Sequence, residues 1–256
     1  MSQKQTTILQ FGLGKFIRSF ADLFVTESEH AGQEIGAVAA VQSTAGTRAE
    51  QLRLQNNSYH VQVRGVADGA AVDEVREVDS IHRAIVAHEE WPEVLDVGTS
   101  SDLRVILSNT TEVGYHRSPE AHPGSLAPVS FPARLLTILK ARFDAHGQPI
   151  TVVPCELIEN NATRLQTIVV DLARSWGMSS DLIAWLMDDV LWLNNLVDRI
   201  TSDPPDDHPL LAEDPLLTVT EPFAFWAIET SDRVDGLFEH PAIVRASDIS
   251  PYGLRK

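Results

Sequence analysis

The sequence predicts an α/β fold with a doubly wound, mostly parallel sheet and extra strands. Along the 256 residues, short apolar runs alternate with longer segments of helical periodicity. This alternation is typical of a parallel sheet with helices on both faces. The first apolar run ends in Gly12-Leu13-Gly14, and two glycines so spaced between a strand and a helix are typical of a dinucleotide-binding turn.

Apolar runs predict four buried strands, at residues 7–11, 36–41, 103–107 and 150–153. Apolar and polar side chains alternate, as in exposed or edge strands, in residues 60–64 and 72–78. Two later strand-like runs lie at residues 216–220 and 223–228. Helical spacing predicts helices at residues 16–30, 80–97, 131–145, 163–176 and 181–191. Pro92 must bend the second helix or mark a new start.

A Pro- and Asp-rich stretch at residues 202–209 predicts a linker. We therefore expect a dinucleotide-binding domain at residues 1–201. The linker, a sheet extension and the start of a further domain are expected at residues 202–256. Ser250 and Pro251 are typical of a helix start close to the last residue of the sequence.

The tips that follow the buried strands should gather at one rim of the sheet, where ligands bind in folds of this class. At the first tip, Gly12 permits the tight turn and Gly14 lets the backbone approach a pyrophosphate, although the usual third glycine is absent. Lys15 and Arg18 either add positive charge there or are ordinary helix-surface residues. After the second strand come Gln42-Ser43-Thr44, with no carboxylate for the adenosine ribose.

Arg48 can meet a 2′-phosphate or be a surface residue, so the choice between NAD and NADP stays open at this point. The third tip, residues 108–112, is entirely polar. Asn109 and Thr110 can donate to a ribose or nicotinamide, and Glu112 is placed for proton transfer. The alternative is a turn rich in Asn and Thr that caps a helix.

The fourth tip, residues 155–161, ends in paired asparagines that can bind a carbonyl oxygen as it gains negative charge. Cys155 is interpreted as a small packing residue, because no strong base lies beside it in the sequence. Asp198 and Arg199 suggest a partly buried ion pair of structural character. From its position alone, Lys256 is a surface lysine.

Composition excludes several classes of protein. A net charge of −16 argues against nucleic acid and anionic membranes as partners. No apolar run is long enough to span a bilayer, and no secretory signal is evident. With one cysteine and no metal-ligand spacing among the nine histidines, we expect no metal site. A cytoplasmic location is the default expectation.

Taken together, these segments resemble the polyol-specific long-chain dehydrogenase/reductase family, also called the mannitol dehydrogenase family. The resemblance rests on motifs in a fixed order along nearly the whole chain: residues 11–18, 108–112, 130–132, 154–158, 196–200, 221–223 and 255–256. The Ser-Asn-Thr-Thr-Glu and Cys-Glu-Leu-Ile forms are most similar to the tagaturonate reductase (altronate oxidoreductase) branch.

The resemblance implies a Rossmann-like fold and a zinc-independent enzyme that passes hydride between NADH and the keto group of a hexuronate, from tagaturonate to altronate. It implies that Gly12, Gly14, Phe16, Arg18, Gln42, Thr44, Asn109 and Thr110 bind the cofactor. It also implies that Glu112 is the acid near the active site, Asn161 the carbonyl-binding asparagine and Lys256 the catalytic lysine. Ala162 stands where the family usually has glycine.

The family's motif continues beyond the lysine with an asparagine and a histidine, and a helical C-terminal domain follows, which this sequence lacks. We therefore expect weak cofactor binding and poor catalysis from these 256 residues. Two alternatives stay open: a mannitol-type dehydrogenase acting on neutral polyols, and a non-catalytic dinucleotide-binding module.

Overall fold

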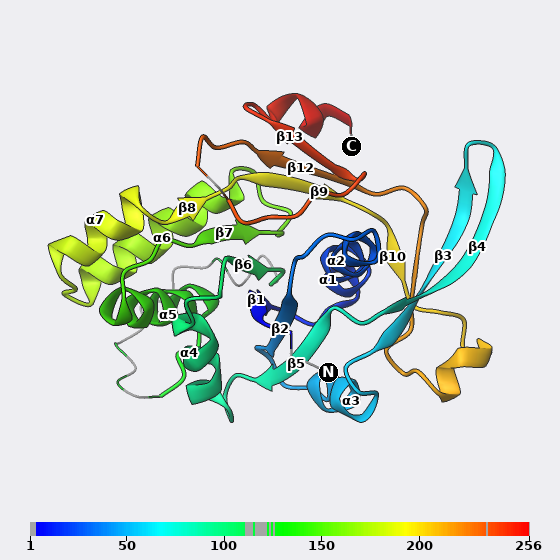
Figure 1. Ribbon diagram of the computed structural model, residues 1–256, viewed down its shortest axis with the longest axis horizontal. Coiled ribbons are helices and arrows are strands. Elements are labelled where there is room, and N and C mark those ends of the chain that lie inside the picture. Colours follow the sequence, from blue (N-terminus) through cyan, green and yellow to red (C-terminus); the bar gives the residue numbers. More distant parts are fainter. Residues whose placement is uncertain are drawn as a thin grey trace.

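The predicted doubly wound parallel sheet is confirmed by the computed structural model, which describes residues 4–110, 115, 122, 124, 126–233 and 235–255. Its central sheet has six strands in the order β5-β2-β1-β6-β7-β8 (Figure 1). The strands are β1 (Thr6–Phe11), β2 (Ala37–Gln42), β5 (Ile81–Val86), β6 (Val105–Ser108), β7 (Thr151–Pro154) and β8 (Leu191–Trp192). Because β1 pairs in parallel with both β2 and β6, the strand order reverses at β1.

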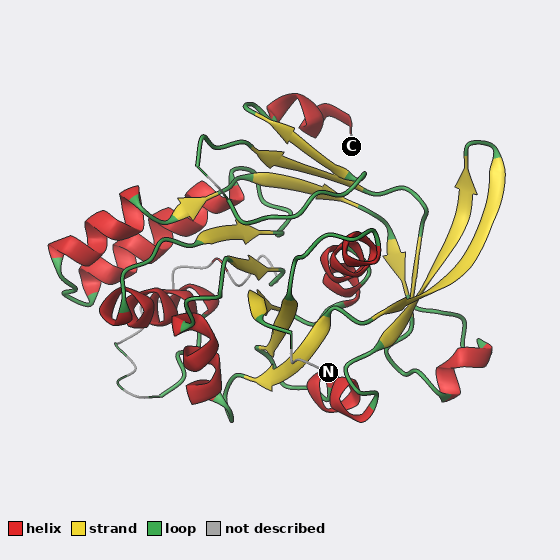
Figure 2. Ribbon diagram, in the orientation of Figure 1, coloured by secondary structure: helices red, strands yellow, loops and turns green. Residues whose placement is uncertain are grey.

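Helices cover both faces of this sheet (Figure 2). One face packs against α1 (Lys15–Arg18), α2 (Ala21–His30) and α3 (Arg48–Leu54). The other packs against α4 (Trp91–Thr99), α5 (Phe131–Ala145), α6 (Asn161–Ser175) and α7 (Ser180–Asp188). Side chains alternate between the two cores along each strand, so that Ile8 of β1 lies in the first core and Leu9 in the second.

Two smaller sheets flank the central one. The first has the order β10-β11-β3-β4, made of β10 (Thr201–Ser202), β11 (Thr218–Thr220), β3 (Tyr59–Ala67) and β4 (Ala70–Val78). The second has the order β13-β12-β9, made of β13 (Ile243–Ala246), β12 (Phe225–Glu229) and β9 (Asn195–Asp198). Short 3-10 helices lie at Pro209–Ala212 and Ser250–Arg255, the latter near the predicted helix start.

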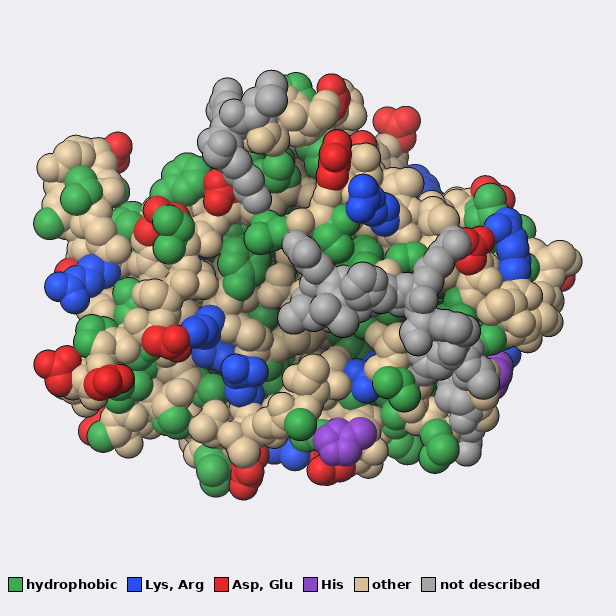
Figure 3. Space-filling model, turned by 180° about the vertical axis from the view of Figure 1, so that it is seen from behind, with side chains coloured by type: hydrophobic (Ala, Val, Ile, Leu, Met, Phe, Trp, Pro, Cys, Tyr) green, Lys and Arg blue, Asp and Glu red, His purple; other side chains and the backbone are tan. Residues whose placement is uncertain are grey.

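The β3–β4 hairpin projects from the body of the molecule (Figure 1). It turns at Asp68 and Gly69, both with positive φ. The same arm is seen at the upper left in Figure 3, and exposed apolar side chains lie on it, among them Val66 (71% exposed) and Val75 (47%). The expectation of exposed or edge strands in this region is therefore confirmed for β4, which forms one edge of its sheet.

Two of the predicted elements were wrong in part. Residues 80–97 are not one helix, because Ile81–Val86 form strand β5 beside β2 and only Trp91–Thr99 are helical, with Pro92 in the first turn. The helix expected at 16–30 is broken at Ser19 and Phe20 into α1 and α2. Strands β8, β9, β10 and β13 were not predicted.

The boundary expected near residue 201 stays a prediction. Beyond it, β11 pairs with β3 and β12 pairs with β9, so residues 218–229 extend sheets that begin earlier in the chain. No helix in the described part of the chain is long and apolar enough to cross a membrane.

Candidate active site

Four strand ends form one rim of the central sheet. Phe11 is paired with Val41 and with Ser108, and Ser108 is paired with Pro154. The polar tips expected after these strands are therefore neighbours, as predicted from the parallel order. The reversal of strand order at β1 places the glycine turn and the turn after β6 at the crevice where such sheets bind ligands.

The glycine turn is fixed by a close approach of the backbone. Gly12 has φ +117°, and a Cβ there would lie 2.7 Å from the carbonyl oxygen of Asn109. Gly14 is different, since its φ is −68° and a Cβ would meet nothing within 4 Å. Within the described residues, the backbone N–H groups of Leu13 and Gly14 donate to no other group of the protein. The turn thus combines open space with two available donors.

Arg18 does not lie on the helix surface or at the turn's open side. Its buried guanidinium donates to the carbonyl of Leu13 at 2.7 Å and to Leu216 O and Thr218 Oγ1 at 2.9 and 3.0 Å. Arg18 thus holds the backbone of the turn, and its expected contact with the cofactor stays a prediction. Lys15 pairs with Asp203 at 2.5 Å, and Phe16 stacks on Phe20 with ring centroids 4.8 Å apart.

A buried polar cluster lies behind the same turn. Gln10 Nε2 donates to Gly12 O at 3.2 Å and to Asp22 Oδ2 at 3.1 Å, and Tyr59 OH lies 3.3 Å from that carboxylate oxygen. Burial raises the pKa of Asp22 to about 7, opposed by the hydrogen bonds from Gln10 and Tyr59 and by the charge of Arg18. Sequence reasoning missed Asp22, which lies inside an apolar helical stretch.

The turn after β2 is only partly available to a ligand. The buried Gln42 side chain donates to Gly46 O at 2.7 Å and accepts from Ala49 N at 2.9 Å, so it holds its own loop. The expected role of Gln42 in binding the cofactor stays a prediction. Thr44 and Arg48 are both exposed beside it.

The turns after β6 and β7 are joined by a carboxylate for which the sequence pattern predicted no role. Glu156 is 3% exposed and accepts from Thr110 N at 2.8 Å and from Thr110 Oγ1 at 3.0 Å. Burial raises the pKa of the Glu156 carboxyl, and the hydrogen bonds it accepts oppose that shift. Asn109 Nδ2 donates at 2.8 Å to the carbonyl oxygen of Cys155, the residue before Glu156. Glu112 lies outside the described residues.

Asn161 is fully buried and bound to the protein itself. Its Nδ2 donates to the carbonyls of Pro154 and Asn195 at 2.7 and 3.0 Å, and its Oδ1 accepts from Ala162 N and Asn195 N at 2.9 and 3.1 Å. Both ends of the amide are thereby used. In this structure the side chain joins α6 to β9, and the expected role of Asn161 in binding a substrate carbonyl stays a prediction. Lys256 lies outside the described residues.

Two structural expectations of the sequence analysis have opposite outcomes. Cys155 is fully buried and burial raises the pKa of its thiol well above the usual range, so its packing role is confirmed. The expected pairing of Arg199 with Asp198 is wrong, because the guanidinium donates instead to the carbonyls of Ser19 and Glu221.

A cavity of about 520 Å³ opens beside the rim. Its walls come from the turn after β7, from β9 and β12, and from residues 248–253. Four of the lining residues are acidic: Glu156, Glu159, Glu229 and Asp248. No lysine or arginine is among the described residues that line it. Residues 248–253 precede Lys256 in the sequence.

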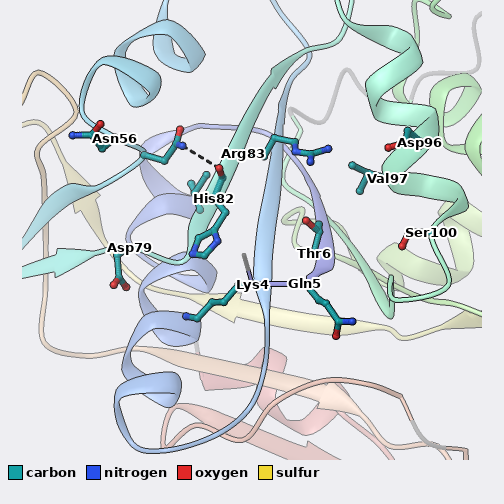
Figure 4. A pocket seen from close by; sticks show the side chains of 12 residues that line it. Lys4, Gln5, Thr6, Asn56, Asp79, His82, Arg83, Asp96, Val97 and Ser100 are labelled. Carbon is teal, nitrogen blue, oxygen red and sulfur yellow. Dashed lines mark hydrogen bonds between the residues drawn. The ribbon is translucent and has the colours of Figure 1, made fainter. Parts of the chain in front are cut away.

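A second cavity, of about 620 Å³, lies at the opposite end of the strands (Figure 4). It is lined by side chains of both signs, including Lys4, His82 and Arg83 with Asp79 and Asp96. Because ligands of such sheets bind at the carboxyl ends of the strands, we assign this cavity no part in the candidate site. In the described part of the chain, no three acidic, histidine or cysteine side chains are grouped to hold a metal ion.

Comparisons with known proteins agree with this architecture. Residues 6–240 match the family described as Mannitol dehydrogenase Rossmann domain. An altronate oxidoreductase of Halalkalibacterium halodurans is 36% identical over 244 residues, covering 91% of this chain and 48% of the relative. An altronate oxidoreductase from Bacillus subtilis is 32% identical over 273 residues, which cover 100% of this chain and 56% of the relative. The chain thus spans about half the length of these relatives.

Solved structures show the same fold at lower identity. A Pseudomonas fluorescens mannitol 2-dehydrogenase, in a ternary complex with NAD and D-mannitol, has a TM-score of 0.83 at 21% identity. The match covers 98% of this chain and 55% of that one. From the motifs, the sheet and these matches, we conclude that the chain belongs to the mannitol dehydrogenase family and carries its Rossmann domain.

Proposed function

We propose that this chain binds NAD and forms the cofactor half of an oxidoreductase that interconverts a hydroxyl and a carbonyl group on a sugar acid or polyol. The observation that carries the proposal is the glycine turn at the reversal of strand order. The space at Gly14 and the available N–H groups of Leu13 and Gly14 fit the pyrophosphate of a dinucleotide.

The remaining contacts to the cofactor are assigned from the same rim. Thr44 is exposed after β2 and would meet the adenosine side, while Asn109 and Thr110 would meet the nicotinamide side. Phe16 would pack beside the turn. When bound, the nicotinamide supplies the site for hydride transfer, and the protein orients it. NAD is preferred in this proposal because the related mannitol 2-dehydrogenase is described with NAD.

The proposed substrate is a keto-hexuronate, with tagaturonate reduced to altronate. Support comes from the relatives named altronate oxidoreductase, at 36% and 32% identity. Lys256 and Glu112 are proposed as the groups that move protons at the reacting oxygen, on the family resemblance alone. Asn161 is not proposed for catalysis, because its amide is already bound within the fold.

A mannitol-type dehydrogenase is the second candidate, and one observation favours it. The cavity beside the rim has four acidic residues in its described lining and no cation, so this wall attracts no substrate carboxylate. A neutral polyol suits such a wall. A hexuronate would need to turn its carboxylate toward a cation supplied from elsewhere.

The cofactor proposal is tested by titrating the purified chain with NADH and NADPH and recording nicotinamide fluorescence. We expect saturable binding of NADH, with NADPH at least tenfold weaker. If neither nucleotide saturates in the millimolar range, the proposed function is wrong.

The catalytic proposal is tested with an NADH oxidation assay. One sample is this chain, and the other is this chain joined to the residues that follow the matched segment in the Halalkalibacterium halodurans relative. Tagaturonate and a neutral ketohexose are offered to both. We expect turnover only from the joined protein, with tagaturonate preferred. Comparable turnover by both samples contradicts the proposal of poor catalysis. Preference for the neutral sugar selects the second candidate, and no turnover by either selects a binding module.

A further inference from the structure

Glu156 occupies a position at which four donors converge on one buried carboxylate. Besides the two groups of Thr110 that donate to Oε1, Ser108 Oγ and Tyr115 OH each lie 3.1 Å from Oε2. Each carboxylate oxygen therefore accepts two hydrogen bonds, which is the usual capacity of such an oxygen. The three donor residues all lie at or beyond the end of β6, whereas Glu156 follows β7.

The contacts continue from Glu156 to the glycine turn. Thr110 is next to Asn109, and the carbonyl oxygen of Asn109 is the atom that a Cβ at Gly12 would meet first. The backbone N–H of Asn109 donates to Phe11 O at 2.8 Å. Any shift of the turn after β6 is therefore transmitted to the glycine turn. Glu156 also lines the cavity beside the rim, so it lies between both parts of the candidate site.

We propose that Glu156 is a positioning residue that holds Ser108, Asn109 and Thr110 in the shape that receives the nicotinamide side of the cofactor. The inference rests on the proposed function for its ligand. Removing the Glu156 carboxylate would break the hydrogen bond from the Thr110 N–H in a half-buried turn. Because losing a buried hydrogen bond is unfavourable, the turn would shift. The reach of the side chain, rather than its charge, sets this geometry.

Two variants separate the effect of the length of the Glu156 side chain from the effect of its charge. Glu156→Gln keeps the length: its oxygen can accept from Thr110 N and Oγ1, and its NH₂ can donate to the hydroxyls of Ser108 and Tyr115. Glu156→Asp keeps the charge but is one methylene shorter, so it cannot reach Thr110 and Ser108 together. The matched control is Glu213→Asp, which makes the same shortening at an exposed carboxylate outside the cavity lining.

Two readouts are compared in the full chain: the Kd for NADH, and amide hydrogen exchange in the segment that contains Asn109 and Thr110. We expect Glu156→Asp to weaken NADH at least tenfold and to speed exchange of the segment at least tenfold. Glu156→Gln and Glu213→Asp should stay within threefold of the parent in both readouts.

Unchanged exchange in Glu156→Asp overturns the inference, and so does an equal loss in Glu156→Gln and Glu156→Asp. Failure of the unaltered chain to bind NADH instead overturns the proposed function. The exchange readout still decides whether Glu156 holds the turn, because it needs no cofactor.

Discussion

At the scale of the residue, the site depends on buried polar side chains that serve the backbone. Arg18, Gln10 and Gln42 each bind carbonyl groups of the turns at the rim, and the Asn161 amide joins α6 to β9. From the sequence, these four side chains have the chemistry of ligand-binding groups. Whether a given amide or guanidinium faces solvent or a carbonyl depends on tertiary contacts, such as that of Arg18 with Leu216, almost 200 positions away.

Asp22 gives this cluster a pH dependence. Folding raises the pKa of Asp22 from 3.8 to about 7, so between these values the folded chain keeps a proton that the unfolded chain has lost. The contribution of Asp22 to the free energy of unfolding therefore falls as pH rises from about 4 to 7 and does not change further above that range. Asp22→Asn removes the dependence.

The measurement is the free energy of unfolding of parent and Asp22→Asn in urea at pH 5 and pH 8. Relative to the parent, the variant should gain about 3 kcal/mol between the two pH values. The exposed Asp206→Asn is the control and should show no comparable gain. A constant difference between parent and Asp22→Asn would show that Asp22 does not titrate in this range.

At the scale of the element, local periodicity predicted most helices and strands but not where long-range partners interrupt them. The break between α1 and α2 frees the carbonyls of Arg18 and Ser19, which accept from Tyr59 OH at 2.8 Å and from Arg199 Nη1 at 2.7 Å. Neither donor is near in sequence. Strand β5 was read as helix because its residues precede a true helix, and only pairing with β2 identifies it.

The junction of α6 with β9 carries a prediction of its own. Asn161→Ala leaves the backbone N–H and carbonyl of Asn195 without their partners in a buried setting. We expect a loss of about 3 kcal/mol in the free energy of unfolding, measured in urea. Asn160→Gly is the control, because Asn160 is exposed and has φ 53°, which glycine adopts readily. A parent-like stability of Asn161→Ala would mean that its side chain is free for another role.

At the scale of the whole molecule, the fold class and the rim could be predicted because both follow from strand order. Alternation of strands and helices indicated the parallel sheet, and the parallel sheet placed four tips side by side. The flanking sheets could not be predicted in this way. They join β9 to β12, and β3 to β11, across long stretches of chain, and the short strands β9 and β13 have no distinctive pattern.

The central claim is that the glycine turn holds a dinucleotide, and the two glycines provide the most direct test. In the chain, Gly14→Ala places a methyl group in open space, so the thermal midpoint should stay within about 2 °C while the Kd for NADH rises at least tenfold. Gly12→Ala meets Asn109 O and is strained at φ +117°, so it should lower both stability and affinity. If Gly14→Ala binds NADH as tightly as the parent, the turn does not hold the cofactor.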